Sequence, residues 1–128
     1  MEIKTIQEQG SMPVTRFAVS GSLNSDEPLL TMARGAYAQG ARKMLIDLSD
    51  VPYMSSAGLR ALHGIYVLLR DQSETSEAVN QGLRDGSYHS PHLKVLNPSR
   101  NVLEVFKMAG YDMFIETHTD LQKALASF

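Results

Sequence analysis

Short apolar runs alternate along this chain with stretches in which apolar residues recur every three or four positions. Residues 44–46 are an apolar, β-prone run that predicts a buried strand, and residues 47–50 are typical of a turn, so the strand should end near Leu48. From residue 59 to residue 69, apolar side chains recur with the spacing of one helical face. The pattern therefore predicts a strand, a turn and a helix, with Ser55 or Ser56 as the N-cap of the helix.

The segments before this unit predict a hairpin and a helix. Residues 2–8 alternate weakly between apolar and polar positions, and residues 14–20 alternate more clearly. Both therefore predict strands, with the first at an edge of the sheet. Ser25 is predicted to cap a helix that ends at Gly40.

The C-terminal third repeats the alternation of strand and helix. Residues 92–96 predict a strand, and Asn97 then predicts a cap, with Pro98 at the first helical position. A short strand at residues 114–117 and a final helix, opened by a capping box at Thr119, complete the pattern.

Strands that alternate with helices after an initial hairpin predict an α/β fold. We expect a mixed sheet of about four to five strands, packed with about four helices. The strands at residues 44–48 and 92–96 should be parallel, because each is followed by a helix. The serine pair then lies at the carboxyl end of a central strand, the usual place of function in open α/β sheets.

Residues 71–91 interrupt this alternation. The stretch is polar, acidic and poor in large apolar side chains. At about twenty residues it is longer than most connections, so we expect a flexible surface loop. It is interpreted either as a tether for a basic partner surface or as an insertion without function.

The composition fits one globular domain, predicted to span residues 1–128. Of the 128 residues, 43% are hydrophobic and 20% are charged, which is close to globular averages. The net charge of −2 argues against a nucleic-acid binder, because phosphate contacts need a basic surface.

Compartment and membrane contact are also constrained by the sequence. No stretch approaches the roughly 18 apolar residues of a membrane span, and the N-terminus lacks the features of a signal peptide. The chain contains no cysteine, which excludes disulfides and thiolate metal sites. We therefore expect a cytoplasmic protein without membrane insertion.

The histidines give little support for catalysis. His63 lies two helical turns beyond Ser56, too far along the axis to act as its base. His89 and His92 lack carboxylate or thiol neighbours for a metal site. With no nucleophile elbow and no phosphate-binding loop, the sequence predicts no enzyme, no cofactor and no metal.

The methionines are interpreted by their place on apolar stripes. Met32, Met44 and Met108 fall on such stripes and predict core positions. Met54, just before the serines, is either a core residue or an adaptable contact in a docking surface.

The two serines themselves have two interpretations. An N-cap serine normally accepts a hydrogen bond from a first-turn N–H group, and this needs no further function. The positive end of the helix dipole also favours a phosphate, so a serine there can be a phosphorylation switch.

The segment around these serines resembles the signature of the STAS domain, as found in bacterial anti-sigma factor antagonists. The resemblance rests on LIDL at residues 45–48, on VPYMSSAGLR at residues 51–60 and on the leucine pair at 68–69. Residues 93–98, LKVLNP, are similar to the C-terminal half of the domain. The resemblance covers nearly all of the chain except residues 71–91 and implies the STAS fold.

The resemblance also implies a partner switch. In that family, a serine kinase that is itself an anti-sigma factor phosphorylates the serine two residues before the glycine, and that position is Ser56. The unphosphorylated protein binds the kinase and displaces the sigma factor; phosphorylation ends the contact, and a serine phosphatase would reset it. The contact residues implied for this chain are Asn24, Met54, Ser55, Ser56, Gly58, Leu59 and Arg60.

Two positions depart from the family pattern. Ser55 stands where the family often carries Asp, and Asn24 replaces the acid of a Gly-x-Leu-Asp segment. Both changes remove a negative charge near the site, and Ser55 becomes an alternative phosphoacceptor.

These departures leave other functions open. One is a non-phosphorylated STAS scaffold in a larger signalling or transport assembly. Another is a nucleotide or small-molecule sensor that uses the helix N-terminus as its anion site.

Overall fold

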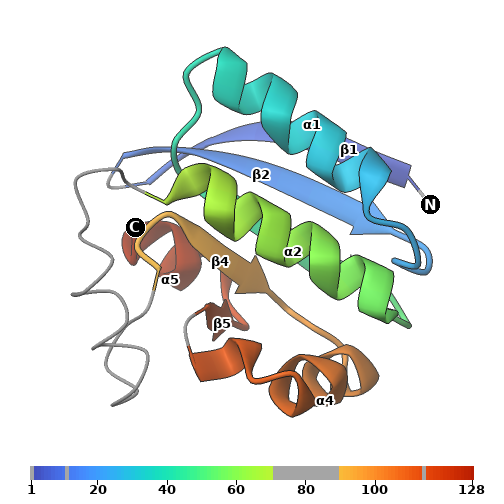
Figure 1. The fold of residues 1–128 in the computed structure, drawn as a ribbon. Coiled ribbons are helices and arrows are strands. Elements are labelled where there is room, and N and C mark those ends of the chain that lie inside the picture. Colours follow the sequence, from blue (N-terminus) through green and yellow to red (C-terminus); the bar gives the residue numbers. More distant parts are fainter. Residues whose placement is uncertain (1, 11, 71–89, 114) are drawn as a thin grey trace, which may run out of the picture.

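A single mixed sheet of five strands organises the computed structural model, which describes residues 2–10, 12–70, 90–113 and 115–128. The strands lie side by side in chain order: β1 (Glu2–Gln9), β2 (Pro13–Ser20), β3 (Met44–Asp50), β4 (Leu93–Leu96) and β5 (Glu116–His118). β1 and β2 are antiparallel, and the remaining pairs are parallel (Figure 1). The predicted α/β class, the hairpin and the parallel pairing of β3 with β4 are confirmed.

Helices cover the two faces of the sheet unequally. α1 (Glu27–Ala38) and α2 (Ser56–Leu69) lie side by side over one face, and α4 (Arg100–Met108) and the 3-10 helix η1 (Tyr111–Met113) pack into the same core. The short α5 (Leu121–Ala126) packs against the opposite face.

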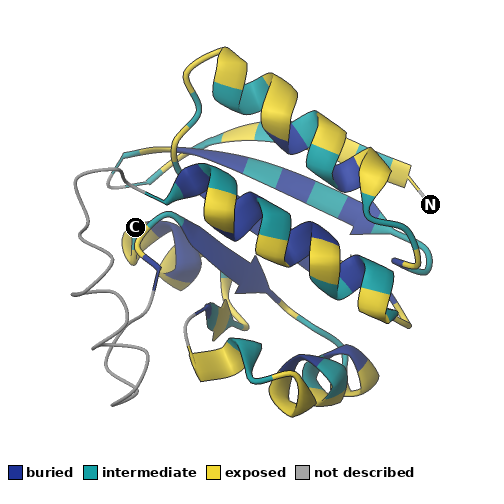
Figure 2. Ribbon diagram, in the orientation of Figure 1, coloured by how far each residue is buried: buried dark blue, intermediate teal, exposed yellow. Residues whose placement is uncertain are grey.

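The core follows the alternation of side chains along β3. Met44, Ile46 and Leu48 join the larger core under α1 and α2, whereas Leu45 joins a smaller core with Leu125 of α5. All of β4 is buried as well (Figure 2). A strand covered on both faces needs apolar residues at successive positions, which explains why Met44, Leu45 and Ile46 follow one another without a polar residue between them.

The predicted start of α4 at Asn97 is wrong. The N-cap is Ser99, whose hydroxyl accepts a hydrogen bond from the backbone N–H of Val102 at 3.3 Å. Asn97 lies just beyond β4 but still bonds to the sheet, because its N–H donates to the carbonyl of His118 at 2.7 Å. Its φ of 50° lies in the left-handed region, where asparagine is tolerated better than most residues.

Two further helix starts are displaced by one residue. The N-cap position of α1 is Asp26 instead of Ser25, without a side-chain capping bond, and α5 is capped by Asp120 instead of Thr119. The Asp120 carboxylate accepts from the N–H of Lys123 at 3.0 Å. Adjacent residues that can both cap a helix cannot be ranked by composition alone.

Three methionines were predicted to lie in the core, and the prediction for Met108 is wrong. Met44 is buried and Met32 packs against the core, but Met108 is 88% exposed. The buried side of α4 carries Val102 and Phe106. Met108 is two residues beyond Phe106, about 200° around the helix, and therefore faces away from the core.

The predicted loop at residues 71–91 lies outside the described residues, except for Ser90 and Pro91. Ser90 is buried, and its hydroxyl accepts a hydrogen bond from the N–H of His92 at 3.3 Å.

Candidate functional site

The entrance of α2 is fixed against the loop that follows β2. Leu23 donates its N–H to the carbonyl of Tyr53 at 2.9 Å, and the carbonyl of Leu23 accepts from Ser55 N–H at 3.0 Å. These bonds frame a parallel bridge between Leu23 and Met54. Residues 21–26 and 51–56 are thereby held together at the carboxyl ends of β2 and β3.

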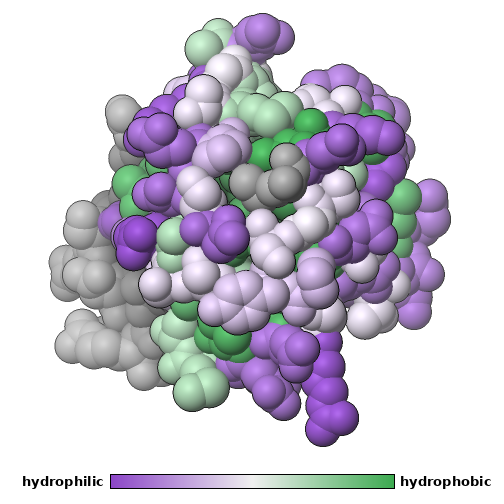
Figure 3. Space-filling view, turned by 90° about the vertical axis from the view of Figure 1, so that its right-hand side faces the viewer, coloured by the Kyte–Doolittle hydropathy of each residue, from purple (hydrophilic) through white to green (hydrophobic). Residues whose placement is uncertain are grey.

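This edge is the right-hand side of Figure 1, toward which the arrowheads of β2 and β4 point. Figure 3 views the molecule from that side and shows mainly hydrophilic and neutral surface, with smaller hydrophobic areas between. Reversible protein–protein interfaces have a similar mixture of polar and apolar surface.

The two serines occupy different positions in the helix entrance. Ser55 is the N-cap, with extended backbone (φ −90°, ψ 178°), and its Oγ accepts from the N–H of Ala57 at 3.2 Å. Ser56 is the first residue of α2 and is exposed. Within the described residues, its hydroxyl has no hydrogen-bond partner. The serine that the family pattern marks is therefore the one that does not cap the helix.

A cation and a carboxylate lie beside Ser56. Arg60 is four residues further along α2, so its side chain shares a helical face with Ser56. Its Nε lies 3.9 Å from a carboxylate oxygen of Asp26, with side chains 64% and 40% exposed. Such an exposed pair contributes little to stability and can exchange partners readily.

Gly58 is required by the close approach of the loop to α2. A Cβ on this residue would lie 2.6 Å from the backbone oxygen of Leu23 and 2.6 Å from Cγ of Met54. Gly58 is buried, so its role in this conformation is to let the helix and the loop pack closely.

Met54 is a core residue and not a docking contact. It is 1% exposed, because the bridge to Leu23 directs its side chain inward. Its neighbour Tyr53 points the other way and is 53% exposed. Of the two interpretations of Met54, the core position is therefore confirmed, and Tyr53, which is absent from the implied contact set, is the exposed member of the pair. Alternation along extended backbone was the available signal that one of the two faces outward.

The remaining predicted contacts lie close to the same edge. Asn24 is exposed in the loop between β2 and α1, and Leu59 is half-buried against the core. The structure thus brings together an exposed set that can meet a partner: Asn24, Tyr53, Ser56 and Arg60.

Asp47, the third residue of the LIDL segment, points to the face of the sheet opposite to the one that α1 and α2 cover. Its carboxylate accepts from Nη1 of Arg16 at 2.8 Å and from the N–H of Ser49 at 3.0 Å. Asp47 is only 9% exposed, and these bonds satisfy both carboxylate oxygens. Its role is structural, because it links β2 to β3 and shapes the end of β3.

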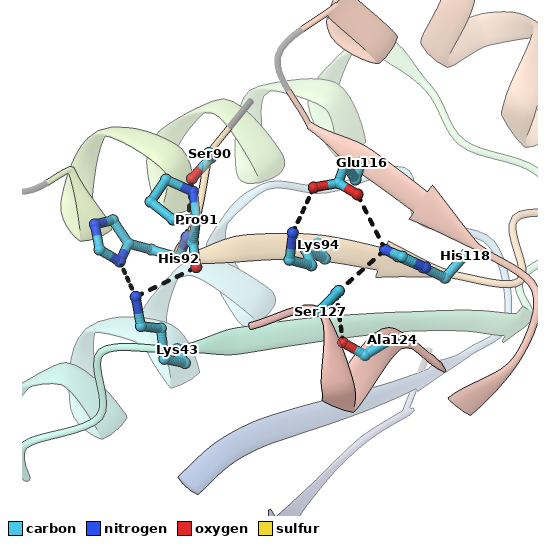
Figure 4. A network of polar contacts seen from close by, with 9 residues as sticks. All are labelled: Lys43, Ser90, Pro91, His92, Lys94, Glu116, His118, Ala124 and Ser127. Atoms are coloured by element: carbon cyan, nitrogen blue, oxygen red, sulfur yellow. Dashed lines mark hydrogen bonds and ion pairs between the residues drawn. The ribbon is translucent and has the colours of Figure 1, made fainter. Parts of the chain in front are cut away.

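A second polar cluster lies between β4, β5 and α5 (Figure 4). Nζ of the buried Lys94 pairs with Glu116 at 2.6 Å, and His118 Nε2 lies 3.5 Å from Glu116 and 3.4 Å from the hydroxyl of Ser127. Serine, histidine and glutamate invite comparison with a catalytic triad. A triad needs the serine and the acid on different ring nitrogens, whereas here both face Nε2.

The hydroxyl of Ser127 is also committed elsewhere, since it donates to the carbonyl of Ala124 at 2.7 Å. This cluster therefore fastens α5 to the edge of the sheet and does not supply an activated nucleophile.

A cavity of about 760 Å³ opens at the other end of the sheet. Its walls come from the β1–β2 hairpin, the C-terminal half of α1 and the residues before β3, among them Gln7, Met32 and Arg42. It shares no residue with the Ser56 edge.

Two absences among the described residues concern metal binding and membrane insertion. No group of three or more histidine or carboxylate side chains there is arranged to hold a metal ion. No helix there is both long and apolar enough to cross a membrane.

Comparison with known proteins gives one family and several related folds. The family model of the STAS domain matches residues 5–76. An anti-sigma factor antagonist from Mycobacterium paratuberculosis superposes with a TM-score of 0.68 at 21% identity, over 98% of this chain and 93% of that one. The Bacillus cell fate determinant SpoIIAA, in its phosphorylated form, gives 0.58 at 19% identity, over 94% and 96%. Among curated proteins, none matches this sequence significantly.

Proposed function

This chain belongs to the STAS domain family, and on that premise we propose that it is an anti-sigma factor antagonist controlled by phosphorylation of Ser56. Unphosphorylated, it binds an anti-sigma factor that is also a serine kinase and thereby releases a sigma factor. Phosphorylated, it dissociates, and a serine phosphatase restores it. This activity belongs in the cytoplasm, with transcription, and needs neither catalysis nor a cofactor of its own.

One observation carries the proposal: Ser56 is exposed at the first position of α2, while Ser55 makes the capping bond. A kinase can approach the Ser56 hydroxyl without breaking the cap. The structural neighbours, which are anti-sigma factor antagonists, support the fold and the partner class.

The surroundings of Ser56 also favour a phosphate. The first-turn N–H groups and the helix dipole attract an anion, and Arg60 is within reach of the same helical face. A phosphate adds about −1.5 to −2 charges. It would draw Arg60 away from Asp26 and change both the charge and the outline of the edge that meets the partner.

The size of this change is sufficient for a switch. If the new charge costs about 3 kcal/mol in the complex, affinity falls roughly a hundredfold, enough to dissociate a micromolar complex.

The contact surface is assigned to Asn24, Tyr53, Ser56 and Arg60, with Leu59 at its margin. Asn24 and Ser55 stand where the family often has acids, so the partner should require less negative charge there. Asp26, close to Arg60, supplies one carboxylate near the edge.

Mass analysis of the protein isolated from its own cells tests the proposal. The expected result is one added phosphate on the peptide that contains Ser56, absent from a Ser56→Ala variant and retained in Ser55→Ala. Phosphate that persists in Ser56→Ala and disappears in Ser55→Ala would move the switch to the neighbouring residue.

The competing function is a STAS scaffold without phosphorylation, favoured by the loss of both acids. If stressed and unstressed cells contain only unmodified protein, the switch is refuted and the scaffold takes its place.

A further inference from the structure

The outer edge of β1 is long and regular. Its eight residues pair with β2 over their whole length with no shift of register. In the described part of the sheet no strand pairs with its other side. Natural edge strands are usually shortened, bulged, interrupted by proline or charged. β1 contains no proline and no bulge, and of these devices it carries only charges, on Glu2, Lys4 and Glu8.

The charges on β1 alternate in sign along one face. Lys4, Ile6 and Glu8 share the face on which Ile6 lies opposite Arg16, because successive side chains of a strand point to opposite sides. Lys4 is exposed, and Ile6 and Glu8 are partly exposed, with Glu8 3.5 Å from Arg16. Around Ile6 the row reads cation, apolar, anion, so opposite charges lie two residues to either side of Ile6.

Such a row complements itself when it is turned around. Two copies of β1 that run antiparallel about a twofold axis place residues of the same face opposite each other. With Ile6 opposite Ile6, each Lys4 faces Glu8 of the other copy. Shifting the axis to Thr5 places Glu2 opposite Glu8, and shifting it to Lys4 places the two lysines together; both shifts oppose like charges.

We propose that a second copy of this chain pairs with the outer edge of β1, antiparallel and with Ile6 on the twofold axis. The two sheets then become one continuous sheet, the backbone groups of both edges are satisfied, and two Lys4–Glu8 pairs fix the register. This proposal does not depend on phosphorylation or on the identity of the partner.

The arrangement leaves the Ser56 edge free. Antiparallel pairing of the two β1 strands also makes the β2 and β3 strands of the two copies run in opposite directions. The carboxyl ends of the parallel strands, and with them the two Ser56 residues, therefore lie at opposite ends of the joined sheet. A dimer of this kind presents two separate docking edges.

Sedimentation of the full chain over a range of concentrations tests the pairing. Wild type should show a reversible monomer–dimer equilibrium. Lys4→Glu alone and Glu8→Lys alone each place like charges opposite one another twice, and each should weaken the dimer about tenfold or more. Lys107→Glu, on the exposed side of α4, is the matched charge control and should leave the equilibrium unchanged.

The decisive sample is an equimolar mixture of the two charge variants. One chain then carries two glutamates and the other two lysines, so both pairs re-form and a mixed dimer should appear. A wild type that stays monomeric at all concentrations, or a mixture that stays monomeric while wild type dimerises, would overturn the proposal.

Glu8→Lys brings a second cation next to Arg16 and can disturb folding. Circular dichroism of each variant shows whether it folds. If Glu8→Lys does not, Ile6→Lys places two lysines on the twofold axis and should abolish the dimer while the chain remains folded; dimerisation of that variant equal to wild type refutes the register.

Discussion

At the scale of single residues, two neighbouring serines have separate roles. The hydroxyl of Ser55 is held by the N–H of Ala57, whereas Ser56 is exposed at the first helical position. The carbonyl of Leu23 sets this division, because it binds the N–H of Ser55 and holds that residue in extended backbone. Capping and the proposed phosphorylation would therefore use different oxygens.

The Ser55→Ala variant should lose about 1 kcal/mol of unfolding free energy, the usual effect of removing an N-cap oxygen. Ser56→Ala should change it by less than about 0.5 kcal/mol, because it removes no bond between described residues. Urea unfolding followed by circular dichroism measures both. A larger loss for Ser56→Ala would show that the two roles are assigned to the wrong residues.

The sequence could identify this pair but could not decide which member caps the helix. The spacing of apolar residues located the start of the helix, and the family pattern pointed to Ser56. The capping residue depends on a contact with Leu23, which is 32 residues away in the chain. Similarly, the choice between Tyr53 and Met54 for the surface depends on the bridge that turns Met54 inward.

At the scale of secondary-structure elements, the packing of the 21–26 loop on α2 needs a glycine. Gly58 lets the backbone of Leu23 approach the helix more closely than any side chain would allow. The loop that carries Asn24 is thereby fixed relative to Ser56. Gly35, in α1, has no such constraint, since a Cβ there would meet no atom within 4 Å.

Alanine substitutions at these two glycines should have opposite effects. Gly58→Ala should destabilise the fold by about 1–3 kcal/mol, because the backbone of Leu23 must move. Gly35→Ala should stabilise it by up to about 1 kcal/mol through helix propensity alone. Thermal unfolding of both variants compares them directly. A stabilising Gly58→Ala would mean that the loop is not held against α2 in solution.

The elements themselves were largely predictable, whereas their ends were not. Alternation and helical spacing located every described strand and the four helices α1, α2, α4 and α5. Asn97 was misjudged because its N–H still binds the neighbouring strand. Met108 was misjudged because a short helix offers too few turns to define its buried side from sequence.

At the scale of the whole molecule, the second face of the sheet holds a buried cation that the sequence did not reveal. Lys94 is 2% exposed and pairs with Glu116 of β5 at 2.6 Å, with Nζ 5.5 Å from the ring centroid of Phe128. The strand pattern around Lys94 predicted its backbone but not its partners, which come from β5 and the end of the chain.

Removing one member of this pair should matter more than removing the other. Glu116→Gln leaves the Lys94 charge buried without a carboxylate and should cost about 1–3 kcal/mol, since Glu116 is itself partly exposed. Lys94→Met retains the apolar stem and leaves Glu116 near solvent, so it should be close to neutral. Urea unfolding distinguishes the two. Equal losses would show that the stem of Lys94, and not its charge, is what matters.

The order of strands in the sheet has a consequence for synthesis of the protein. Because the strands lie in chain order, each strand that leaves the ribosome finds its partner edge already made. The sheet can therefore grow in one direction during translation, from the β1–β2 hairpin towards β5. Two edges of the described sheet stay unpaired by any later strand: the outer side of β5, which is made last, and the outer side of β1, which is made first and is therefore open for the whole of synthesis.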